Sequence, residues 1–220
     1  MKVLCEMSGG ADSALAAIYA KRKYPKAKEF ICIYVDYGQL YAEPEADCSY
    51  ALTNKIFGEL YSWLRITIQD MFDENEDYSS EGVASEYFPL RNMILTSIAA
   101  SQAVRFGAEV IVTGSKSLIK DHADPFSFRD STMGFYTAME IALNAGLERG
   151  NIRIEPLLAM GRTEKLPKLQ VYRELMEEGI NPRETWSCYH SGNLAERCGE
   201  CRNCRILEDA VNRLRKVAAG

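Results

Sequence analysis

The chain has 220 residues and a formal net charge of −5, which is enough length for one well-packed core and a small appendage. The acidic balance argues against a protein whose main task is to grip duplex nucleic acid by its phosphates. The sequence has no run of about 18 apolar residues, so it predicts no membrane span. Its first apolar stretch is too short for the core of a signal peptide, and we expect a cytoplasmic protein.

Strand-like and helix-like segments alternate along the chain. Apolar runs predict strands at residues 3–7, 29–35, 60–68, 109–113 and 151–155, and helical periodicity predicts helices at residues 13–24, 43–58, 90–106, 132–148, 163–178 and from residue 202 onward. Residues 70–86 are acidic and rich in serine, and they predict a loop. The alternation predicts an α/β fold with a Rossmann-like, doubly wound, five-stranded parallel sheet and helices on both faces.

The division of the chain follows from the same pattern. We expect residues 1–184 to form the α/β domain, and residues 185–220, which carry four clustered cysteines, to pack on it as an appendage. Ligands of open parallel sheets bind beyond the carboxyl ends of the strands. This rule predicts that residues 8–13, 36–40 and 114–116 lie together on one rim of the sheet.

The first strand runs directly into residues 8–13, which read Ser-Gly-Gly-Ala-Asp-Ser. Two glycines let the backbone approach an anion, and the start of the next helix supplies free N–H groups and a positive dipole end. The hydroxyls of Ser8 and Ser13 add donors, so the stretch predicts a phosphate-binding loop. It lacks the lysine of the P-loop and the third glycine of the dinucleotide fingerprint. The alternative is a plain turn capped by Asp12 or Ser13.

Two further stretches carry polar groups at positions that suit a binding site. Asp36 and Gln39 follow the second predicted strand, where a carboxylate and an amide can read adenine or ribose; the alternative is an ordinary turn with a capping aspartate. Pro89 suits the N-terminus of the long helix that follows. Arg91 then lies in the first turn, where it opposes the helix dipole, so either a bound anion or solvation of the guanidinium explains it.

Four of the seven cysteines lie within one short C-terminal stretch: Cys188, Cys198, Cys201 and Cys204. Clustered cysteines in a cytosolic chain indicate a metal site more often than disulfides. Four thiolates at this spacing close a tetrahedral shell around Zn²⁺, and we expect a structural zinc; an iron–sulfur cluster is the alternative. The remaining Cys5, Cys32 and Cys48 lie in apolar or helical stretches and predict inert core positions.

Several motifs together carry a resemblance. The loop at residues 8–13 resembles the pyrophosphate loop of the N-type ATP pyrophosphatases. The ordered set resembles the 7-cyano-7-deazaguanine synthase family of queuosine biosynthesis, and it spans nearly the whole chain. Its members are residues 8–13, 36–39 (Asp-Tyr-Gly-Gln), 87–92 (Tyr-Phe-Pro-Leu-Arg-Asn), 156–157 (Pro-Leu), 163–165 (Thr-Glu-Lys), 185–189 (Thr-Trp-Ser-Cys-Tyr) and 198–204.

The resemblance implies an ATP-dependent carbon–nitrogen ligase that converts 7-carboxy-7-deazaguanine and ammonia into 7-cyano-7-deazaguanine through an adenylated carboxylate and an adenylated amide. It implies ATP with Mg²⁺, free ammonia as the nitrogen source, a homodimer, and no direct contact with nucleic acid.

The same resemblance implies the roles of individual residues. Asp12 would help magnesium or the phosphates, and Lys165 would balance phosphate charge; both are candidate catalytic residues. The implied ATP-binding residues are Met7, Ser8, Gly9, Gly10, Ala11, Asp12, Ser13, Asp36, Gln39 and Gly114. The implied substrate-binding residues are Tyr87, Arg91, Asn92, Asp130 and Phe135.

One segment departs from the family pattern. The family carries Tyr-Pro-Asp-Cys-Arg-Pro-Glu-Phe after its fourth strand, and residues 128–135 read Phe-Arg-Asp-Ser-Thr-Met-Gly-Phe instead. Asp130 keeps a carboxylate that can accept hydrogen bonds from a guanine-like edge, and Phe135 keeps an aromatic wall. Ser131 and Thr132 replace the cysteine and the arginine. Glu6 is unusual in a buried parallel strand, and the pattern does not explain it.

Four alternatives stay open. The enzyme stops at 7-amido-7-deazaguanine, or it acts on a related deazaguanine destined for DNA modification. An inactive, zinc-stabilised partner subunit that binds nucleotides is a third reading, but it has little reason to keep the loop at residues 8–13 intact. A fourth, an ATP pyrophosphatase that thiolates tRNA directly, needs a basic RNA-binding face, which the acidic balance disfavours.

Overall fold

The computed structural model describes residues 1–68, 90–116, 129–148, 151–162, 165–189 and 196–218. Its strands are β1 (Lys2–Glu6), β2 (Glu29–Asp36), β3 (Tyr61–Thr67), β4 (Val110–Thr113) and β5 (Arg153–Pro156). Its α-helices are α1 (Ala11–Lys23), α2 (Ala42–Phe57), α3 (Arg91–Phe106), α4 (Met133–Gly146), α5 (Lys168–Glu177) and α6 (Arg202–Ala218), and two short 3₁₀ helices are η1 (Arg129–Ser131) and η2 (Pro182–Glu184). Every strand and helix that the pattern predicts is present.

The five strands form one parallel sheet in the order β3-β2-β1-β4-β5. β1 lies in the centre, where Cys5 pairs with Cys32 of β2 on one side and with Val112 of β4 on the other. Parallel neighbours need crossover connections, which the helices provide. The predicted doubly wound sheet is therefore confirmed, and the carboxyl ends of β1, β2 and β4 meet at one rim.

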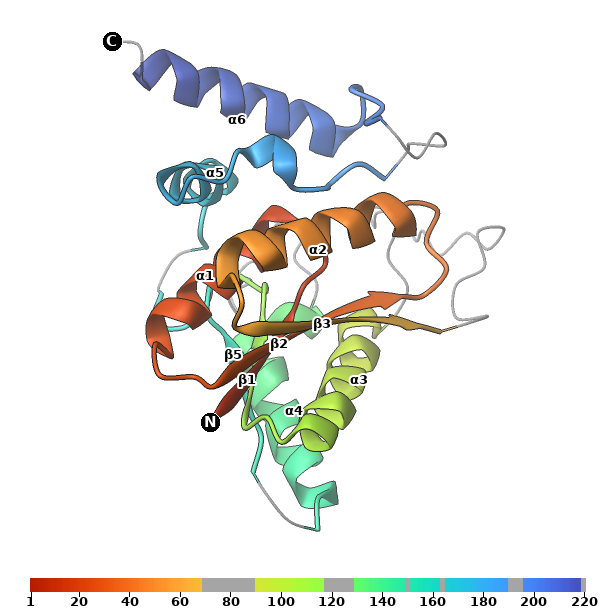
Figure 1. Ribbon diagram of the computed structural model, residues 1–220. Helices are drawn as coiled ribbons and strands as arrows, with labels where there is room; N and C mark the ends of the chain where they lie inside the picture. The colour runs from red at the N-terminus through yellow and green to blue at the C-terminus, as the bar shows by residue number, and fades with distance from the viewer. Residues whose placement is uncertain (69–89, 117–128, 149–150, 163–164, 190–195, 219–220) are drawn as a thin grey trace.

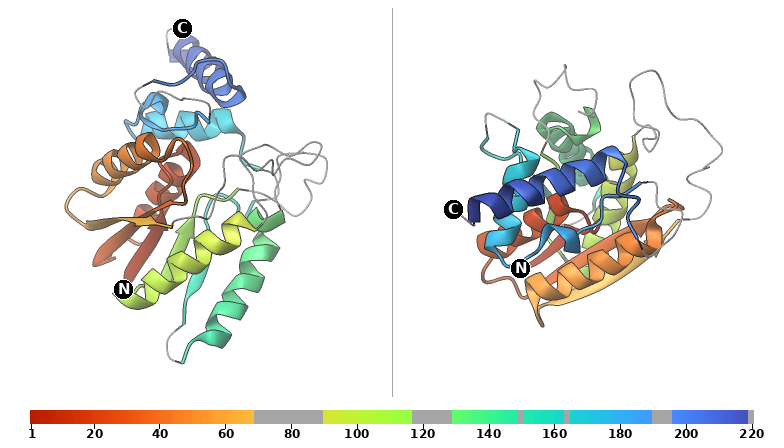
Figure 2. Two further views of the ribbon diagram at one scale, coloured as in Figure 1. Left: turned by 90° about the vertical axis from the view of Figure 1, so that its right-hand side faces the viewer. Right: turned by 90° about the horizontal axis from the view of Figure 1, so that it is seen from above.

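Helices cover both faces of the sheet (Figures 1 and 2). α1 and α2 pack on one face, with α5 and then α6 stacked outside them, while α3 and α4 cover the other face. Side chains of a strand alternate between the two faces, so Val3 and Cys5 join the core beneath α1, whereas Leu4 joins the core beneath α3. The two cores therefore pack against the sheet from both sides.

The final helix adds to the first of these cores. Leu207, Ala210, Val211 and Leu214 of α6 lie in the same apolar cluster as the buried side chains of α1 and α5. Their spacing places them on one stripe of the helix. The division into residues 1–184 and 185–220 stays a prediction. Within the described ranges, no helix combines the length and the apolar character that a membrane span needs.

The predicted start of the helix at residues 163–178 is wrong, because α5 begins at Lys168. Pro167 precedes it in extended conformation, with ψ of 145°, and a proline also disfavours helical backbone at the residue before it. Lys165 therefore lies in an irregular segment, and Lys168 moves into the first turn of the helix. Residues 163–164 and the predicted loop at residues 70–86 lie outside the described residues.

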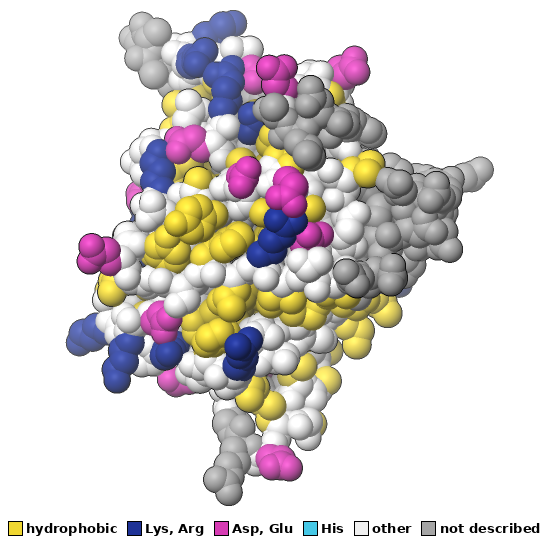
Figure 3. Space-filling view, turned by 45° about the vertical axis from the view of Figure 1, so that its right-hand side comes forward, with side chains coloured by type: hydrophobic (Ala, Val, Ile, Leu, Met, Phe, Trp, Pro, Cys, Tyr) yellow, Lys and Arg dark blue, Asp and Glu magenta, His cyan; other side chains and the backbone are white. Residues whose placement is uncertain are grey.

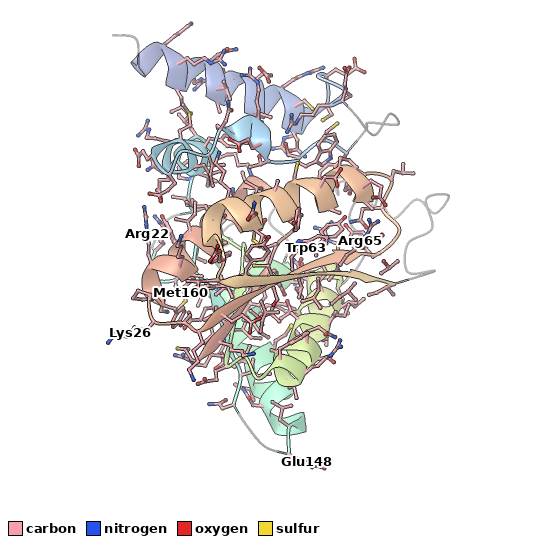
Figure 4. The ribbon with its side chains drawn as sticks, in the orientation of Figure 1. Arg22, Lys26, Trp63, Arg65, Glu148 and Met160 are labelled. Carbon is pink, nitrogen blue, oxygen red and sulfur yellow. The ribbon has the colours of Figure 1, made fainter. Side chains whose placement is uncertain are left out.

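The edge strand β3 is tied to the rim through α2. Trp63 and Arg65 rise from β3 toward α2 (Figure 4), where Trp63 Nε1 donates to Ser49 Oγ at 2.9 Å and Arg65 Nη1 donates to Glu43 at 2.9 Å. Ser49 Oγ in turn donates to the carbonyl of Met7 at 2.6 Å. This relay anchors the backbone that leaves β1.

Candidate active site

The loop between β1 and α1 follows a tight course that requires glycine. Gly9 has φ of +76°, and a Cβ at this position would lie 2.4 Å from the carbonyl oxygen of Glu45, so only glycine fits. Ser8 Oγ donates to Ser13 Oγ at 3.1 Å, and Ser13 Oγ donates to the carbonyl of Gly10 at 2.9 Å. These contacts place both hydroxyls at the mouth of the loop.

The expected capping of this turn by Asp12 or Ser13 is wrong. Gly10 occupies the N-cap position of α1, and no side chain caps this helix. The end of β4 also approaches the first turn of α1, since a Cβ on Gly114 would lie 2.8 Å from Ser13 N and 3.0 Å from the carbonyl carbon of Asp12. The helix N-terminus, its dipole and the approach of Gly114 form a cradle suited to an anion.

Asp12 lies between two lysines at this cradle. Its Oδ1 accepts from Lys116 Nζ and its Oδ2 from Lys168 Nζ, both at 2.9 Å. Burial alone would raise the Asp12 pKa, but Lys168 and Lys116 outweigh it and hold the pKa at about 2. Burial lowers the pKa of Lys116, whereas Asp12 reverses this effect at Lys168 and leaves its pKa raised. The cluster therefore holds two ammonium groups around one carboxylate.

A cavity of about 350 Å³ opens at the rim beside this cluster. The predicted residues that line it are Met7, Ser8, Asp12, Ser13, Gln39, Arg91, Asn92, Gly114 and Lys165. We call the part next to the N-terminus of α1 the α1 side; it is lined by Ser8, Asp12, Ser13 and Lys116. We call the part next to the core beneath α3 the α3 side; it is lined by Glu6, Asn92, Leu95 and Tyr136. The three predicted rim segments thus meet around one cavity.

Gln39 lines the cavity with its amide already engaged. Its Oε1 accepts from the backbone N–H of Tyr37 at 2.9 Å, and its Nε2 donates to Tyr34 Oη at 2.7 Å and to Glu45 Oε2 at 3.1 Å. Burial raises the pKa of Glu45 to about 7, although the hydrogen bonds from Gln39 and Tyr34 oppose that rise. The network shapes the wall at the end of β2.

Asp36 lies outside the lining of the cavity. Its Oδ2 accepts from Arg65 Nη2 at 2.7 Å, and its Oδ1 accepts from the backbone N–H of Gly38 at 3.0 Å. These bonds fix the turn that carries Gln39. The structure therefore brings Gln39 to the cavity and places Asp36 behind it.

Arg91 enters the cavity from the first turn of α3. The residue before it, Leu90, has φ of +61°, which is a strained, left-handed conformation for a non-glycine residue. Arg91 faces the side chains of Tyr37, Tyr41 and Tyr189. The strained entry to the helix thus aims a cation at the cavity. Tyr87, predicted with it, lies outside the described residues.

Asp130 lies at the N-terminus of α3 and not in the lining of the cavity. It is buried, and its Oδ2 accepts from the backbone N–H of Asn92 at 3.1 Å. Its Oδ1 has no hydrogen-bond partner among the described residues. The carboxylate thus completes the first turn of the helix that carries Arg91.

Phe135 packs against its neighbour Tyr136, with ring centroids 5.3 Å apart, and the cavity is lined by Tyr136 instead. Thr132, which replaces the arginine of the family segment, is the N-cap of α4 and accepts from the backbone N–H of Phe135 at 3.3 Å. Ser131, which replaces the cysteine, lines the cavity, and its carbonyl accepts from Ser115 Oγ. The departures from the family segment therefore cap a helix and leave a small polar wall.

Glu6 is the last residue of β1 and lines the α3 side of the cavity. Its Oε1 is shielded from solvent and has no hydrogen-bond partner among the described residues. Burial raises the Glu6 pKa to about 7, an effect that the Thr96 hydroxyl only partly opposes. The unusual carboxylate of the strand is thus a cavity residue.

The four C-terminal cysteines lie together, with their Sγ atoms all within 4.8 Å of one another. Backbone N–H groups point at the sulfurs: Cys201 N donates to Cys198 Sγ at 3.3 Å, and Cys204 N donates to Cys201 Sγ at 3.5 Å. Backbone hydrogen bonds from Cys201 and Glu200 lower the pKa of Cys198 to about 6. Four close sulfurs, with backbone N–H groups directed at them, fit a tetrahedral metal centre.

The cysteine cluster is connected to the loop of the cavity through Trp186. Its indole N–H donates to the carbonyl of Cys188 at 2.9 Å, and its backbone N–H donates to the carbonyl of Gly9 at 2.8 Å. Tyr189, next to Cys188, also lines the cavity. The cluster therefore supports one wall of the site.

Comparison with known proteins places the chain in a family. The family model described as "Queuosine biosynthesis protein QueC" matches residues 2–215. The chain belongs to this family. The 7-cyano-7-deazaguanine synthase of Sulfurovum sp. (strain NBC37-1) is 31% identical over 217 residues, which cover 93% of this chain and 90% of the relative. That of Methanoculleus marisnigri is 28% identical over 225 residues, which cover 97% and 95%.

A solved structure shares the fold of this QueC-family chain. The U34-tRNA thiolase NcsA from Methanococcus maripaludis, with its [4Fe-4S] cluster, matches with a TM-score of 0.50 and 18% identity, over 98% of this chain and 67% of that chain. At this level of identity the likeness shows the architecture alone.

The cavity or cradle residues that sequence reasoning missed in this QueC-family member include Glu45, Lys116, Tyr136 and Lys168. Lys116 belongs to the predicted rim segment 114–116, so its position carried a signal. Lys168 lies within the helix whose start was predicted five residues too early. Tyr136 was hidden by the family match of Phe135, and Glu45 gave no signal, because an acidic residue early in a helix is ordinary.

Proposed function

We propose that this protein makes 7-cyano-7-deazaguanine from 7-carboxy-7-deazaguanine, ammonia and ATP, through an adenylated carboxylate and an adenylated amide. Membership of the QueC family and the names of its relatives support this proposal. The single observation that carries it is the cradle: a helix N-terminus, two serine hydroxyls and two lysines converge beside a cavity of about 350 Å³.

The α1 side of the cavity holds the phosphates of ATP in this proposal. Ser8, Ser13 and the N–H groups at the start of α1 donate to the β- and γ-phosphates, with Met7, Gly9, Gly10, Ala11 and Gly114 shaping the backbone around them. Lys116 and Lys168 each carry a charge that Asp12 holds in place before ATP arrives. Lys165, which lines the same cavity, adds a third cation near the phosphates.

Asp12 orients the two lysines, and its carboxylate oxygens would hold Mg²⁺. When bound, Mg²⁺ neutralises charge on the departing pyrophosphate. The protein itself makes two further contributions. The cradle aligns the α-phosphate, and the cavity wall excludes water from the adenylated group.

Adenylation makes the carboxylate of the substrate reactive toward ammonia. A carboxylate is a poor electrophile because its leaving group would be oxide, whereas AMP is a good leaving group. Ammonia then attacks the adenylated carboxyl carbon, AMP leaves, and the amide forms. A second adenylation on the amide oxygen, followed by loss of AMP and protons, gives the nitrile. Positioning and neutralisation of charge, which the cradle provides, are the main requirements of both adenylations.

The nucleoside part of ATP lies against the end of β2 in this proposal. Gln39 presents the wall there, and Asp36 holds the turn in place. Arg91 and Asn92 bind the deazaguanine substrate from the first turn of α3, and Tyr87 lies beside them in this proposal. Asp130 and Phe135 support this wall from behind, since neither lines the cavity. Asp130 acts through the backbone of Asn92, which it holds at 3.1 Å.

We also propose that the cysteine cluster binds one structural zinc ion. Four protein sulfurs leave no open coordination position, and Trp186 transmits the fixed geometry to the loop at Gly9. An iron–sulfur cluster is the second candidate, because the fold is shared with a thiolase that holds one. Elemental analysis and absorbance decide between them: one zinc in a colourless protein supports zinc, and a brown protein that absorbs near 400 nm overturns it.

A homodimer in the cytoplasm completes the proposal. Tyr50 of α2 and Leu60, in the turn between α2 and the edge strand β3, are exposed apolar side chains, and Figure 3 shows apolar groups gathered on the face that carries these elements. An exposed sheet edge of this kind suits pairing with a second copy. Light scattering on the purified protein tests the dimer by its mass.

Incubation with 7-carboxy-7-deazaguanine, MgATP and ammonia, followed by mass spectrometry over time, tests the reaction. Accumulation of the nitrile supports the proposal. Persistent amide supports an enzyme that stops after one adenylation. A chain that consumes no substrate under these conditions contradicts both and favours an inactive nucleotide-binding subunit.

A further inference from the structure

Glu6 differs from the other acidic residues of the cavity. Among the described residues, three acidic side chains line it: Glu6, Asp12 and Glu45. Asp12 accepts from two lysines, and Glu45 accepts from Gln39 and Tyr34. Glu6 keeps Oε1 without a partner in the described part of the chain. It therefore has acceptor capacity that the described residues do not use.

The position of Glu6 makes this open acceptor costly for the free protein. Leu4, two residues earlier on the same face of β1, lies fully inside the core beneath α3. A carboxylate placed next to that core loses hydration, which is why its pKa rises to about 7. Donors on a ligand would replace the lost hydration and restore its stability. A ligand that donates hydrogen bonds would therefore stabilise the Glu6 carboxylate.

We propose that Glu6 is a specificity-determining residue that accepts hydrogen bonds from the two adjacent N–H donors on the pyrimidine edge of a guanine-like base. This inference rests on the proposed function and names the group that reads the base. The side-chain carboxyl turns about its last bond with little resistance, so both oxygens can face the ligand. The ring of Tyr136, on the same side of the cavity, supplies an apolar wall for the base.

The chemistry distinguishes a guanine-like base from adenine. A guanine-type edge presents a ring N–H beside an exocyclic amino group, and a carboxylate accepts from both. Adenine presents one amino group beside a ring nitrogen that is itself an acceptor, which a carboxylate repels. Glu6 therefore suits the deazaguanine substrate and not the base of ATP.

Asp130 is the competing candidate for the same role. Its Oδ1 is also unpartnered among the described residues, but its Oδ2 accepts from Asn92 N, and Asp130 does not line the cavity. The comparison of Glu6→Gln with Asp130→Asn separates a residue that touches the base from one that positions α3. Both substitutions keep the size of the side chain and replace one acceptor oxygen with a donor.

The experiment measures kcat/KM with two bases, 7-carboxy-7-deazaguanine and its analogue without the 2-amino group, in the wild type and both variants. We expect the wild type to lose about 10–100-fold with the analogue. Glu6→Gln should lose a similar factor with the full substrate, show little further loss with the analogue, and keep its KM for ATP within about twofold. Asp130→Asn should keep the wild-type preference for the 2-amino group.

Three results would overturn the assignment of Glu6. The first is a Glu6→Gln enzyme that still prefers the base with the 2-amino group. The second is a Glu6→Gln enzyme whose KM rises for ATP and not for the base. The third is loss of the preference for the 2-amino group in Asp130→Asn alone. Calorimetric binding of the two bases to the wild-type protein needs neither turnover nor a variant. If the wild type makes no product, the proposed function fails, and equal calorimetric binding of the two bases would separately refute base recognition at the 2-amino edge.

Discussion

The α1 side and the α3 side of the cavity hold their charges in different ways. On the α1 side the Asp12 carboxylate has a lysine partner at 2.9 Å on each oxygen, so its charges are paired before any ligand binds. On the α3 side Glu6 retains an oxygen with no partner among the described residues. The α1 side is therefore preorganised for a charged ligand. The α3 side instead suits a ligand that brings uncharged hydrogen-bond donors.

This difference separates the generic part of the reaction from the specific part. An ATP pyrophosphatase must align phosphates and neutralise pyrophosphate, and we propose that the cradle serves that need. The choice of substrate depends on the groups that face the base. The comparison therefore predicts that substitutions on the two sides change different kinetic constants.

The largest expected effect comes from breaking the cluster that supports the α1 side. Cys201→Ser should release the metal and lower the melting temperature by about 10 °C or more, because a structural metal contributes folding free energy directly. Metal content and thermal unfolding measure it. Cys48→Ala is the matched control, since Cys48 lies outside the four-sulfur cluster. A Cys201→Ser protein that keeps its metal and its melting temperature would mean that the cluster is misassigned.

The next largest effect concerns the paired charges themselves. Asp12→Ala should lower the rate of pyrophosphate release by about 10²–10³-fold, because Lys116 and Lys168 lose the carboxylate that holds them together. The fold should stay intact. A coupled pyrophosphate assay checks the rate, and the exposed Asp47→Asn serves as the control. Unchanged pyrophosphate release would remove Asp12 from the mechanism.

A smaller effect follows from crowding the cradle. In Gly114→Ala the new Cβ would meet Ser13 N at 2.8 Å and must push β4 away from the start of α1. We expect KM for ATP to rise about tenfold, with a smaller change in KM for the deazaguanine. Gly146→Ala is the control, because a Cβ there meets nothing within 4 Å. Equal rises in KM for ATP and in KM for the deazaguanine would argue against separate binding of the two substrates on the α1 side and the α3 side.

The smallest expected effect is a pH-dependent change in the stability of the folded protein, caused by Glu6 on the α3 side. The folded pKa of Glu6, about 7, lies above its ordinary value of 4.5, so the folded state binds the extra proton between these values and loses stability as pH rises through them. Glu6→Gln removes that loss. We expect it to gain roughly 1–3 kcal/mol over the wild type at pH 8 and little at pH 4.

Thermal unfolding across this pH range measures the gain as a shift of a few degrees. Tyr136 of α4 and Cys5 of β1 are titratable neighbours of Glu6. Burial raises the pKa of Tyr136, and the hydrogen bond with Cys32 together with burial raises the pKa of Cys5, so both pKa values lie above this window. The exposed Glu59→Gln is the control. A gain that is the same at pH 4 and pH 8 would contradict the buried, charged carboxylate.

Most of the fold could be predicted from the sequence, because its signals are local. Apolar runs such as residues 29–35 and the helical periodicity that follows them fix strand and helix without distant contacts. The rim of the sheet then follows from topology alone. The start of α5 was the exception, since the pattern continued through Pro167 while the proline prevented the helix.

The site could be predicted only where chemistry and chain position coincide. Gly9 and the serines beside it form one continuous stretch, so the pattern exposes their purpose. The Asp12–Lys168 pair joins residues 156 positions apart, and no local pattern contains it. Glu6 became interpretable only when the structure placed it on the cavity wall. Contacts between distant residues are set by packing, which a single sequence does not display.

The most direct test of the central claim counts the products of ATP. If two adenylations occur in the cradle, each molecule of 7-cyano-7-deazaguanine should be accompanied by two molecules of AMP and two of pyrophosphate. Chromatography of nucleotides and mass spectrometry of the base, in one time course, provide both counts. Release of ADP and inorganic phosphate, or consumption of ATP without any amide or nitrile, would contradict the account.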